Sequence, residues 1–355
     1  MTMNNAYAQV LAAAPGDRRD LFVGAGQRLG TAPQNIEKDF WVCWTLDALF
    51  NGRGSEGPRL LFKGGTSLSK GFGLIERFSE DIDITVFRED IGEEASVEAL
   101  EALSGKKRQA KLDSIKAACQ AFIGGNLLVQ LSATLAEAMT LTDGETAAAK
   151  VELDTDDESR QSLLLWYPSV TDPSDGYIRK AIKIESGAKS ALDPHAKHTI
   201  TPYLFEDLPN LDLTVANVTI VDAERTFWDK VVILHGLRRW FDARQVLRAG
   251  GQRVSRHYYD VYQLMAAETG FAALANPELG RDCVAHARMF FNSRDLDLAH
   301  AEPGSFSLNP TEAMIADLRR DYDAMTGMIF GEVPGFDAVL ASVDDLERRL
   351  NGSAT

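Results

Sequence analysis

The sequence has few cysteines, no long apolar run and no excess of positive charge, and each absence excludes a class of protein. Cys43, Cys119 and Cys283 stand far apart without a CxxC pair, so we expect reduced, mostly buried thiols rather than a disulfide framework. No apolar run approaches the ~20 residues that a membrane span needs, and residues 1–20 lack the pattern of a secretory signal. The sequence therefore predicts a cytoplasmic protein with no membrane partner.

Positive charge is scarce overall and unevenly distributed. The net charge of −15 over 355 residues argues against general coating of nucleic acid, which depends on neutralising phosphates. Lysine and arginine nevertheless gather in two stretches, Asp222–His257 and Tyr177–Thr201, while acids gather in Glu89–Glu101 and Asp143–Glu158. The two basic stretches are compatible with ordinary solvated surface and with a local basic groove.

Two aspartates in the stretch Phe62–Val86, FKGGTSLSKGFGLIERFSEDIDITV, form the first candidate site. Asp81 and Asp83 alternate with apolar residues, which is the period of a strand, so their carboxylates share a face. Two like charges this close repel, and burying them is costly unless a cation sits between them. Mg²⁺ is commonly held by one or two carboxylates plus substrate phosphates. The pattern indicates a metal site, with an acidic strand edge as the alternative.

A glycine pair upstream of the acids forms the second part of this candidate site. Gly64-Gly65 is followed by two hydroxyl side chains, Thr66 and Ser67. Glycines let backbone N–H groups approach a phosphate closely, ideally where a helix begins. Together with the aspartates, the turn suggests a metal-dependent nucleotide site.

Periodicity and turn residues predict a mixed chain of helices and strands. Helices are expected at residues 1–30 with a glycine-rich break at 24–30, and at 34–50, 67–75, 106–122, 222–240, 255–267, 311–328 and 336–351. Strands are expected at 59–63, 80–87, 147–154, 162–167 and 177–186. Gly124-Gly125 is expected to break the chain. His195 and His198 fall in a polar stretch that we interpret as a loop or a phosphate-proximal segment rather than a zinc site, because no further cysteine or histidine stands beside them.

Two later segments place further candidate residues together. Alternation in residues 177–186 puts Lys183 and Glu185 on one face of a strand. Helical spacing puts Arg256, Asp260 and their neighbours on one face of the helix at 255–267. That second face could carry a buried structural Arg–Asp pair or contact a substrate.

These motifs together resemble the AbiEii/AbiGii-type toxin nucleotidyltransferases of the DNA polymerase beta-like superfamily. The superfamily signature is a glycine turn, an acid–apolar–acid strand and a third carboxylate on a later strand, here matched by Gly64-Gly65, Asp81-Ile82-Asp83 and Glu185. Residues 34–350 also contain blocks resembling the family in the expected order: Glu37-Lys38-Asp39-Phe40-Trp41, Glu224-Arg225-Thr226-Phe227-Trp228-Asp229-Lys230, Arg256-His257-Tyr258-Tyr259-Asp260 and Asp321-Tyr322 through Phe330-Gly331. The gap between glycines and acids is longer than in the general superfamily pattern. Gly65 also stands where many members have serine, which leaves open whether Thr66 or Ser67 meets the phosphate.

The resemblance implies an α+β fold in two domains. Residues 1–209 would form a polymerase-beta-like nucleotidyltransferase domain with N-terminal helices and a mixed sheet. Residues 210–355 would form a mainly helical C-terminal domain.

The resemblance also implies a chemistry, the transfer of NMP from an NTP with two metal ions, Mg²⁺ or Mn²⁺. Metal-binding and catalytic roles would fall to Asp81, Asp83 and Glu185, with Lys183 neutralising triphosphate charge. Nucleotide-binding roles would fall to Gly64, Gly65, Thr66, Ser67, Lys230, Arg256 and Asp260.

The acceptor implied by the resemblance is the 3′ end of tRNA, modified by the toxin of a type IV toxin–antitoxin system with an antitoxin encoded nearby. NMP transfer to a small molecule or a protein hydroxyl remains an alternative that the negative net charge favours. A non-catalytic nucleotide-binding module is a second alternative, against which the intact set of acids argues.

Overall fold

The chain divides into two compact units. The computed structural model describes residues 3–54, 57–142, 149–171, 179–248 and 253–352. The first unit comprises Met1–Gly71, Phe78–Ala95 and Gly105–Val221, and the second comprises Phe72–Arg77, Ser96–Ser104 and Asp222–Thr355. The domain division at residues 209 and 210 stays a prediction. The two short segments that join the second unit were not foreseen, because membership of a unit depends on contacts far along the chain.

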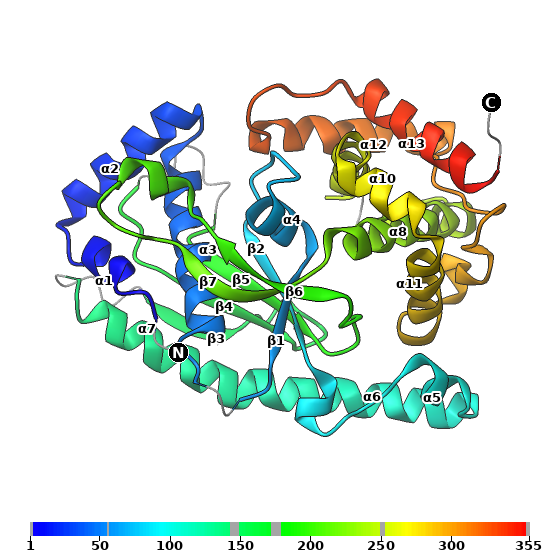
Figure 1. Cartoon of the computed structure of the whole chain (residues 1–355), viewed down its shortest axis with the longest axis horizontal. Helices are drawn as coiled ribbons and strands as arrows, with labels where there is room; N and C mark the ends of the chain where they lie inside the picture. Colours follow the sequence, from blue (N-terminus) through cyan, green and yellow to red (C-terminus); the bar gives the residue numbers. More distant parts are fainter. Residues whose placement is uncertain (1–2, 55–56, 143–148, 172–178, 249–252, 353–355) are drawn as a thin grey trace. The chain divides into compact units, whose positions relative to one another are not determined.

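The first unit is built on a seven-stranded mixed sheet in the order β3-β4-β5-β2-β1-β7-β6 (Figure 1). The strands are β1 Leu60–Lys63, β2 Asp81–Val86, β3 Lys150–Leu153, β4 Ser162–Trp166, β5 Ala181–Gly187, β6 His195–Ile200 and β7 Val215–Val221. β2 runs parallel to β5, and β1 runs parallel to β7, whereas the other neighbours are antiparallel. The predicted α+β class with a mixed sheet is confirmed. Residues 147, 148, 177 and 178 of the predicted strands lie outside the described residues.

Two strands, β6 and β7, were not predicted. β6 lies at the edge of the sheet and its residues are mostly exposed, so it lacks the apolar alternation that identifies a strand. The interpretation of His195 and His198 as loop residues is therefore wrong, because both lie on β6. Residues three apart on a strand point to opposite faces, so these two rings are not placed as a metal-binding pair.

The helices of the first unit include α3, which packs against β5 and β7 (Figure 1), and α7, which packs against β3. They are α1 Asn5–Leu11, α2 Pro15–Leu29, α3 Pro33–Phe50, α4 Gly64–Phe72, α6 Gly105–Phe122 and α7 Leu128–Met139. α4 begins at Gly64, three residues before the predicted start. α2 passes through the expected glycine break and ends at Leu29, where Gly30 caps it in the left-handed conformation with a φ of 66°.

The predicted break at Gly124-Gly125 is also wrong. A π-helical turn, Ile123–Leu127, joins α6 to α7 without interruption. Packing of α7 against β3 outweighs the low helix propensity of the two glycines. By length and composition the resulting helix, Gly105–Met139, is the one described helix that could cross a membrane, a test that a core helix of a soluble protein also passes.

The second unit is mainly helical. Its helices are α5 Val97–Glu101, α8 Ala223–Arg244, α9 Ser255–Ala266, α10 Glu268–Ala275, α11 Pro277–Phe290, α12 Glu312–Met325 and α13 Phe336–Leu350. The predicted apolar stripe of α8, formed by Phe227, Val231 and Leu234, is fully buried. Asp222 takes the predicted N-cap position, although its side chain makes no capping hydrogen bond.

Candidate active site

Strand register places a row of polar residues across the sheet of the first unit. Asp83 on β2 lies between Lys63 on β1 and Glu185 on β5, and Glu185 in turn lies opposite Ser162 on β4. The backbone N–H of Asp154, just after β3, donates to the carbonyl oxygen of Ser162. Because register partners share a face of a sheet, this row carries the second aspartate and the third predicted acid side by side.

A lysine lies among these acids. Lys183 is the register partner of Asp81, and its Nζ atom lies 2.8 Å from Oε1 of Glu185 and 3.5 Å from Oδ2 of Asp154. Burial lowers the pKa of Lys183, but the hydrogen bond to Glu185 and the charges of Glu185, Asp154 and Asp81 outweigh that effect and raise the pKa. The predicted sharing of a face by Lys183 and Glu185 is confirmed. Asp154 was missed because nothing in the sequence links it to this row.

The glycine turn meets the aspartates directly. Gly64 is the first residue of α4 and has a φ of 81°, which side chains rarely adopt. A Cβ atom at Gly64 would also overlap Oδ2 of Asp83. The turn therefore needs glycine for two reasons, and the N-terminus of α4 starts beside the carboxylate of Asp83.

Both hydroxyl side chains that follow the turn are buried. Thr66 shares a hydrogen bond of 2.6 Å with Ser79 and donates at 2.5 Å to the carbonyl oxygen of Asp81, while Ser67 donates at 2.9 Å to the carbonyl oxygen of Gly64. Thr66 thereby connects α4 to the first residue of β2. These bonds engage both hydroxyl groups within the local fold, while the first backbone N–H groups of a helix are the groups that lack partners within the helix itself.

The acids have the right chemistry for a hard cation, but their side chains do not converge. Among the parts of the chain that the structure describes, no three acidic, histidine or cysteine side chains are grouped closely enough to hold a metal ion. Glu185 instead faces Lys183, whose ammonium group provides the positive charge at this position. The Glu185 side chain is 42% exposed and is therefore not fixed by burial. Carboxylate oxygens are the donor type that Mg²⁺ and Mn²⁺ prefer, so the chemistry of the three acids suits either ion.

The remaining predicted site residues belong to the second unit, where Asp260 is fully buried between two cations. Nε and Nη2 of Arg77 lie 2.8 and 3.0 Å from its two carboxylate oxygens, and Nζ of Lys230 lies 2.7 Å from one of them. The predicted face is therefore a buried ion pair, but its arginine is Arg77 and not Arg256. Arg256 lies on the same helix and is half-buried. Arg77 stands inside the stretch first singled out, yet no local pattern connects it to a residue this far along the chain.

The cations of this cluster hold Asp260 in its ionised form, whereas burial, together with the charges of Arg77 and Arg256, lowers the pKa of Lys230 despite its contact with Asp260. Burial alone would raise the pKa of Asp260, but Arg77 and Lys230 hold it well below its usual range. Burial and the positive charges of Lys230 and Arg256 hold the pKa of the neighbouring His257 well below its usual value. His257 is therefore neutral at neutral pH, and its Nδ1 atom can accept from Lys230 Nζ at 3.3 Å.

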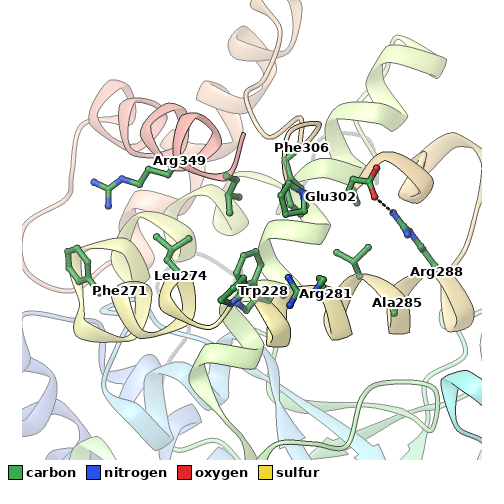
Figure 2. A pocket seen from close by; sticks show the side chains of 15 residues that line it. Trp228, Phe271, Leu274, Arg281, Ala285, Arg288, Glu302, Phe306 and Arg349 are labelled. Atoms are coloured by element: carbon green, nitrogen blue, oxygen red, sulfur yellow. Dashed lines mark ion pairs between the residues drawn. The ribbon is translucent and has the colours of Figure 1, made fainter. Parts of the chain in front are cut away.

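The second unit also contains a cavity of about 670 Å³ that the sequence did not suggest (Figure 2). Trp228, Leu274 and Phe306 give it apolar walls. Arg288 points toward Glu302, and their charged atoms lie 3.8 Å apart. The volume suits a small ligand or a partner side chain.

Comparison with known proteins gives the class of this site and then its family. The family model described as nucleotidyl transferase AbiEii toxin, type IV TA system, matches residues 47–342. The protein is thus a nucleotidyltransferase. More particularly, the chain belongs to the AbiEii toxin family of type IV toxin–antitoxin systems, and membership implies an NTP substrate and an antitoxin partner.

One solved structure similar to this chain is MenT4, a nucleotidyltransferase toxin from Mycobacterium tuberculosis H37Rv. The two share 15% sequence identity over 94% of this chain and 97% of that chain, with a TM-score of 0.45. No curated protein matches the chain.

Proposed function

We propose that the protein transfers NMP from an NTP to the 3′ end of tRNA in a metal-dependent reaction, as the cytoplasmic toxin of a type IV toxin–antitoxin system. One observation carries the proposal. The glycine turn at Gly64 begins against Asp83, and Asp83 lies opposite Glu185 on the parallel neighbouring strand. A triphosphate held at the turn would therefore lie beside carboxylates that share one face of the sheet.

The chain's own groups have distinct tasks in this proposal. Backbone N–H groups at the start of α4, from Gly64 to Ser67, bind the β- and γ-phosphates, because the first N–H groups of a helix are available to anions. Lys183 neutralises charge on the triphosphate. Glu185 accepts the proton of the attacking hydroxyl, whose oxygen bonds to the α-phosphorus as the bond to pyrophosphate breaks and pyrophosphate leaves. Positioning and charge neutralisation supply most of the rate enhancement in such transfers.

Asp81, Asp83 and Glu185 would hold the divalent ions. When bound, two such ions neutralise developing charge on the attacking and leaving oxygens. Asp81 and Asp83 are each only partly buried, which is compatible with access by ions that arrive with the NTP.

Residues of the second unit have a supporting task. Lys230 and Arg256 contact the nucleotide or the acceptor in the proposal. Asp260 has both oxygens bonded to cations, so it acts by holding Lys230 and Arg77 in place. Lys230 keeps further donor capacity, because an ammonium group has three protons.

Labelled NTPs test the proposal directly. The protein is incubated with each of the four α-labelled NTPs, a divalent ion and total RNA, and the label is then located on RNA, protein or small molecules. We expect label at tRNA 3′ ends with wild type and none with Asp83→Asn of equal melting temperature. Label on a small molecule or a protein, with none on RNA, would instead support the alternative acceptors. Undiminished transfer by Asp83→Asn would refute the assigned site.

A further inference from the structure

We propose that Lys38 is a positioning residue that sets the register of the two acid-bearing strands. The inference deepens the proposed function and rests on it for its kinetic consequence. Lys38 lies in the second turn of the buried helix α3, and its side chain is only 2% exposed. Neither the sequence motifs nor the site chemistry gives this lysine a task.

The ammonium group of Lys38 bonds to the entrances of both strands. Its Nζ atom donates to Oε2 of Glu80 at 2.5 Å and to the carbonyl oxygen of Arg179 at 3.1 Å. Glu80 immediately precedes Asp81, the first residue of β2, and Arg179 stands two residues before Ala181, the first residue of β5. One buried charge therefore connects the two points at which the strands enter the sheet.

Register between these strands needs such a connection. β2 and β5 are parallel, so no hairpin turn fixes how they align, and a long segment of chain separates them. A slip of one residue would be excluded, because it would turn the apolar side chains of Ile82 and Ile84 to the other face. A slip of two residues keeps every side chain on its face. It would nevertheless move Asp83 from Glu185 to Lys183 or to Gly187.

Lys38 makes the two-residue slip unfavourable. A slip moves the carbonyl oxygen of Arg179 relative to Glu80, so the buried ammonium group could no longer reach both. A buried charge that loses a partner is strongly destabilising, because no water replaces the lost hydrogen bond. The hydrophobic pattern thus limits the register to every second position, and Lys38 selects the position that pairs Asp83 with Glu185.

The residues on either side of Lys38 bind other segments of the first unit. Glu37 accepts from the backbone N–H of Val170 at 2.6 Å. Asp39 accepts from the backbone N–H of Tyr203 at 2.7 Å and pairs with Lys70 of α4. Successive helical residues point about 100° apart, which explains how three neighbours reach three segments. Of the three, Lys38 bonds to the entrances of both acid-bearing strands.

Hydrogen exchange tests the proposal without relying on activity. The variants are Lys38→Met, the milder Glu80→Gln, and Asp47→Asn as a control. Asp47 is buried on the same helix but bonds to Asn4 and Asn51, away from β2 and β5. We expect backbone amides of residues 82–86 and 182–187 to exchange at least about tenfold faster in Lys38→Met than in Asp47→Asn at matched stability. Unchanged exchange there in both Lys38→Met and Glu80→Gln would overturn the proposal.

Kinetics separate this inference from the proposed function. We expect Lys38→Met to lower kcat about tenfold or more and to raise the divalent-ion concentration needed for half-maximal rate, with KM for NTP nearly unchanged. The double variant Lys38→Met/Glu80→Gln should have a kcat no lower than that of Lys38→Met alone, because both substitutions act through one contact. A wild type without transferase activity would refute the proposed function, while the exchange result would still decide the role of Lys38. If amides throughout the first unit exchange faster in Lys38→Met, and by the same factor as in Asp47→Asn, Lys38 has a general structural role and does not set the register.

Discussion

Gly64 is the residue at which backbone conformation and site chemistry meet. We predict that Gly64→Ala abolishes transfer, because the added Cβ would displace the carboxylate of Asp83 as well as strain a φ of 81°. The strain alone should cost about 1–2 kcal/mol of unfolding free energy. Steady-state transfer assays and urea denaturation measure the two effects separately.

Gly92 offers a matched control for that substitution. Its φ is 76°, and an added Cβ would meet no atom within 4 Å. Gly92→Ala should therefore show a similar stability loss with nearly full activity. Equal activity losses in the two variants would show that backbone strain, and not the position of Asp83, accounts for the effect.

The buried ion pairs of Asp260 lead to a second prediction about a single residue. Asp260→Asn should lower the unfolding free energy by about 3–5 kcal/mol, because Arg77 and Lys230 would lose their buried counter-charge. Arg256→Ala on the same helix should change stability little and should act on KM if Arg256 contacts nucleotide or acceptor. Denaturation curves for both variants decide this, and a stable Asp260→Asn protein would contradict the interpretation of the cluster.

At the scale of elements, β5 brings a cation to the acids of β2. We predict that Lys183→Met lowers kcat by about 10²–10³-fold, as expected when one preorganised charge facing a reacting phosphate is removed. Its raised pKa keeps Lys183 protonated at neutral pH, so its titration should not shape the pH–rate profile near neutrality. Lys150→Met, on β3 of the same sheet and paired with Glu152, is the control and should retain full activity. Comparable losses in both would indicate a general effect of surface charge.

Local patterns predicted those elements whose own residues determine them. The alternation around Asp81 and Asp83 identified β2, and apolar spacing identified α3 and α8, because one buried face imposes its period on the sequence. The glycine pair within residues 123–127 suggested a break that the structure does not have, because packing of α7 on β3 maintains the helix there. The edge strand β6 was missed because it buries almost no side chain.

Contacts between distant residues could not be predicted in the same way. Arg77 and Asp260, or Lys38 and Arg179, meet only in the folded chain, and no spacing rule relates them. Glu185 was selected as the third acid through the family resemblance. The strand register that places it opposite Asp83 agrees with that choice, although its catalytic role stays a prediction.

Stability of the whole molecule should depend on pH through His257. The native state holds this ring neutral beside Lys230 and Arg256, with Asp260 as the nearby counter-charge, whereas the unfolded state protonates it below about pH 6.5. The unfolded chain then binds a proton that the native chain does not. Unfolding free energy should therefore fall by up to about 1.4 kcal/mol per pH unit as pH drops below about 6.5. Urea denaturation at pH 7.5, 6.5, 5.5 and 5.0 measures this slope.

His257→Gln isolates the contribution of this one ring. Glutamine does not titrate, and its side-chain oxygen can accept from Lys230 as the Nδ1 atom does. The unfolding free energy of the variant should fall less than that of wild type between pH 6.5 and 5.0, because the variant lacks the proton uptake of His257 on unfolding. Most carboxylates remain ionised in that pH range and contribute little to the difference. Identical slopes in the two proteins would mean that His257 becomes protonated in the native state as readily as in the unfolded one. That result would mean that the positive charges of Lys230 and Arg256 do not disfavour protonation of the ring. Asp260 would then neutralise those charges more completely than the 3.3 Å contact between Lys230 and His257 suggests.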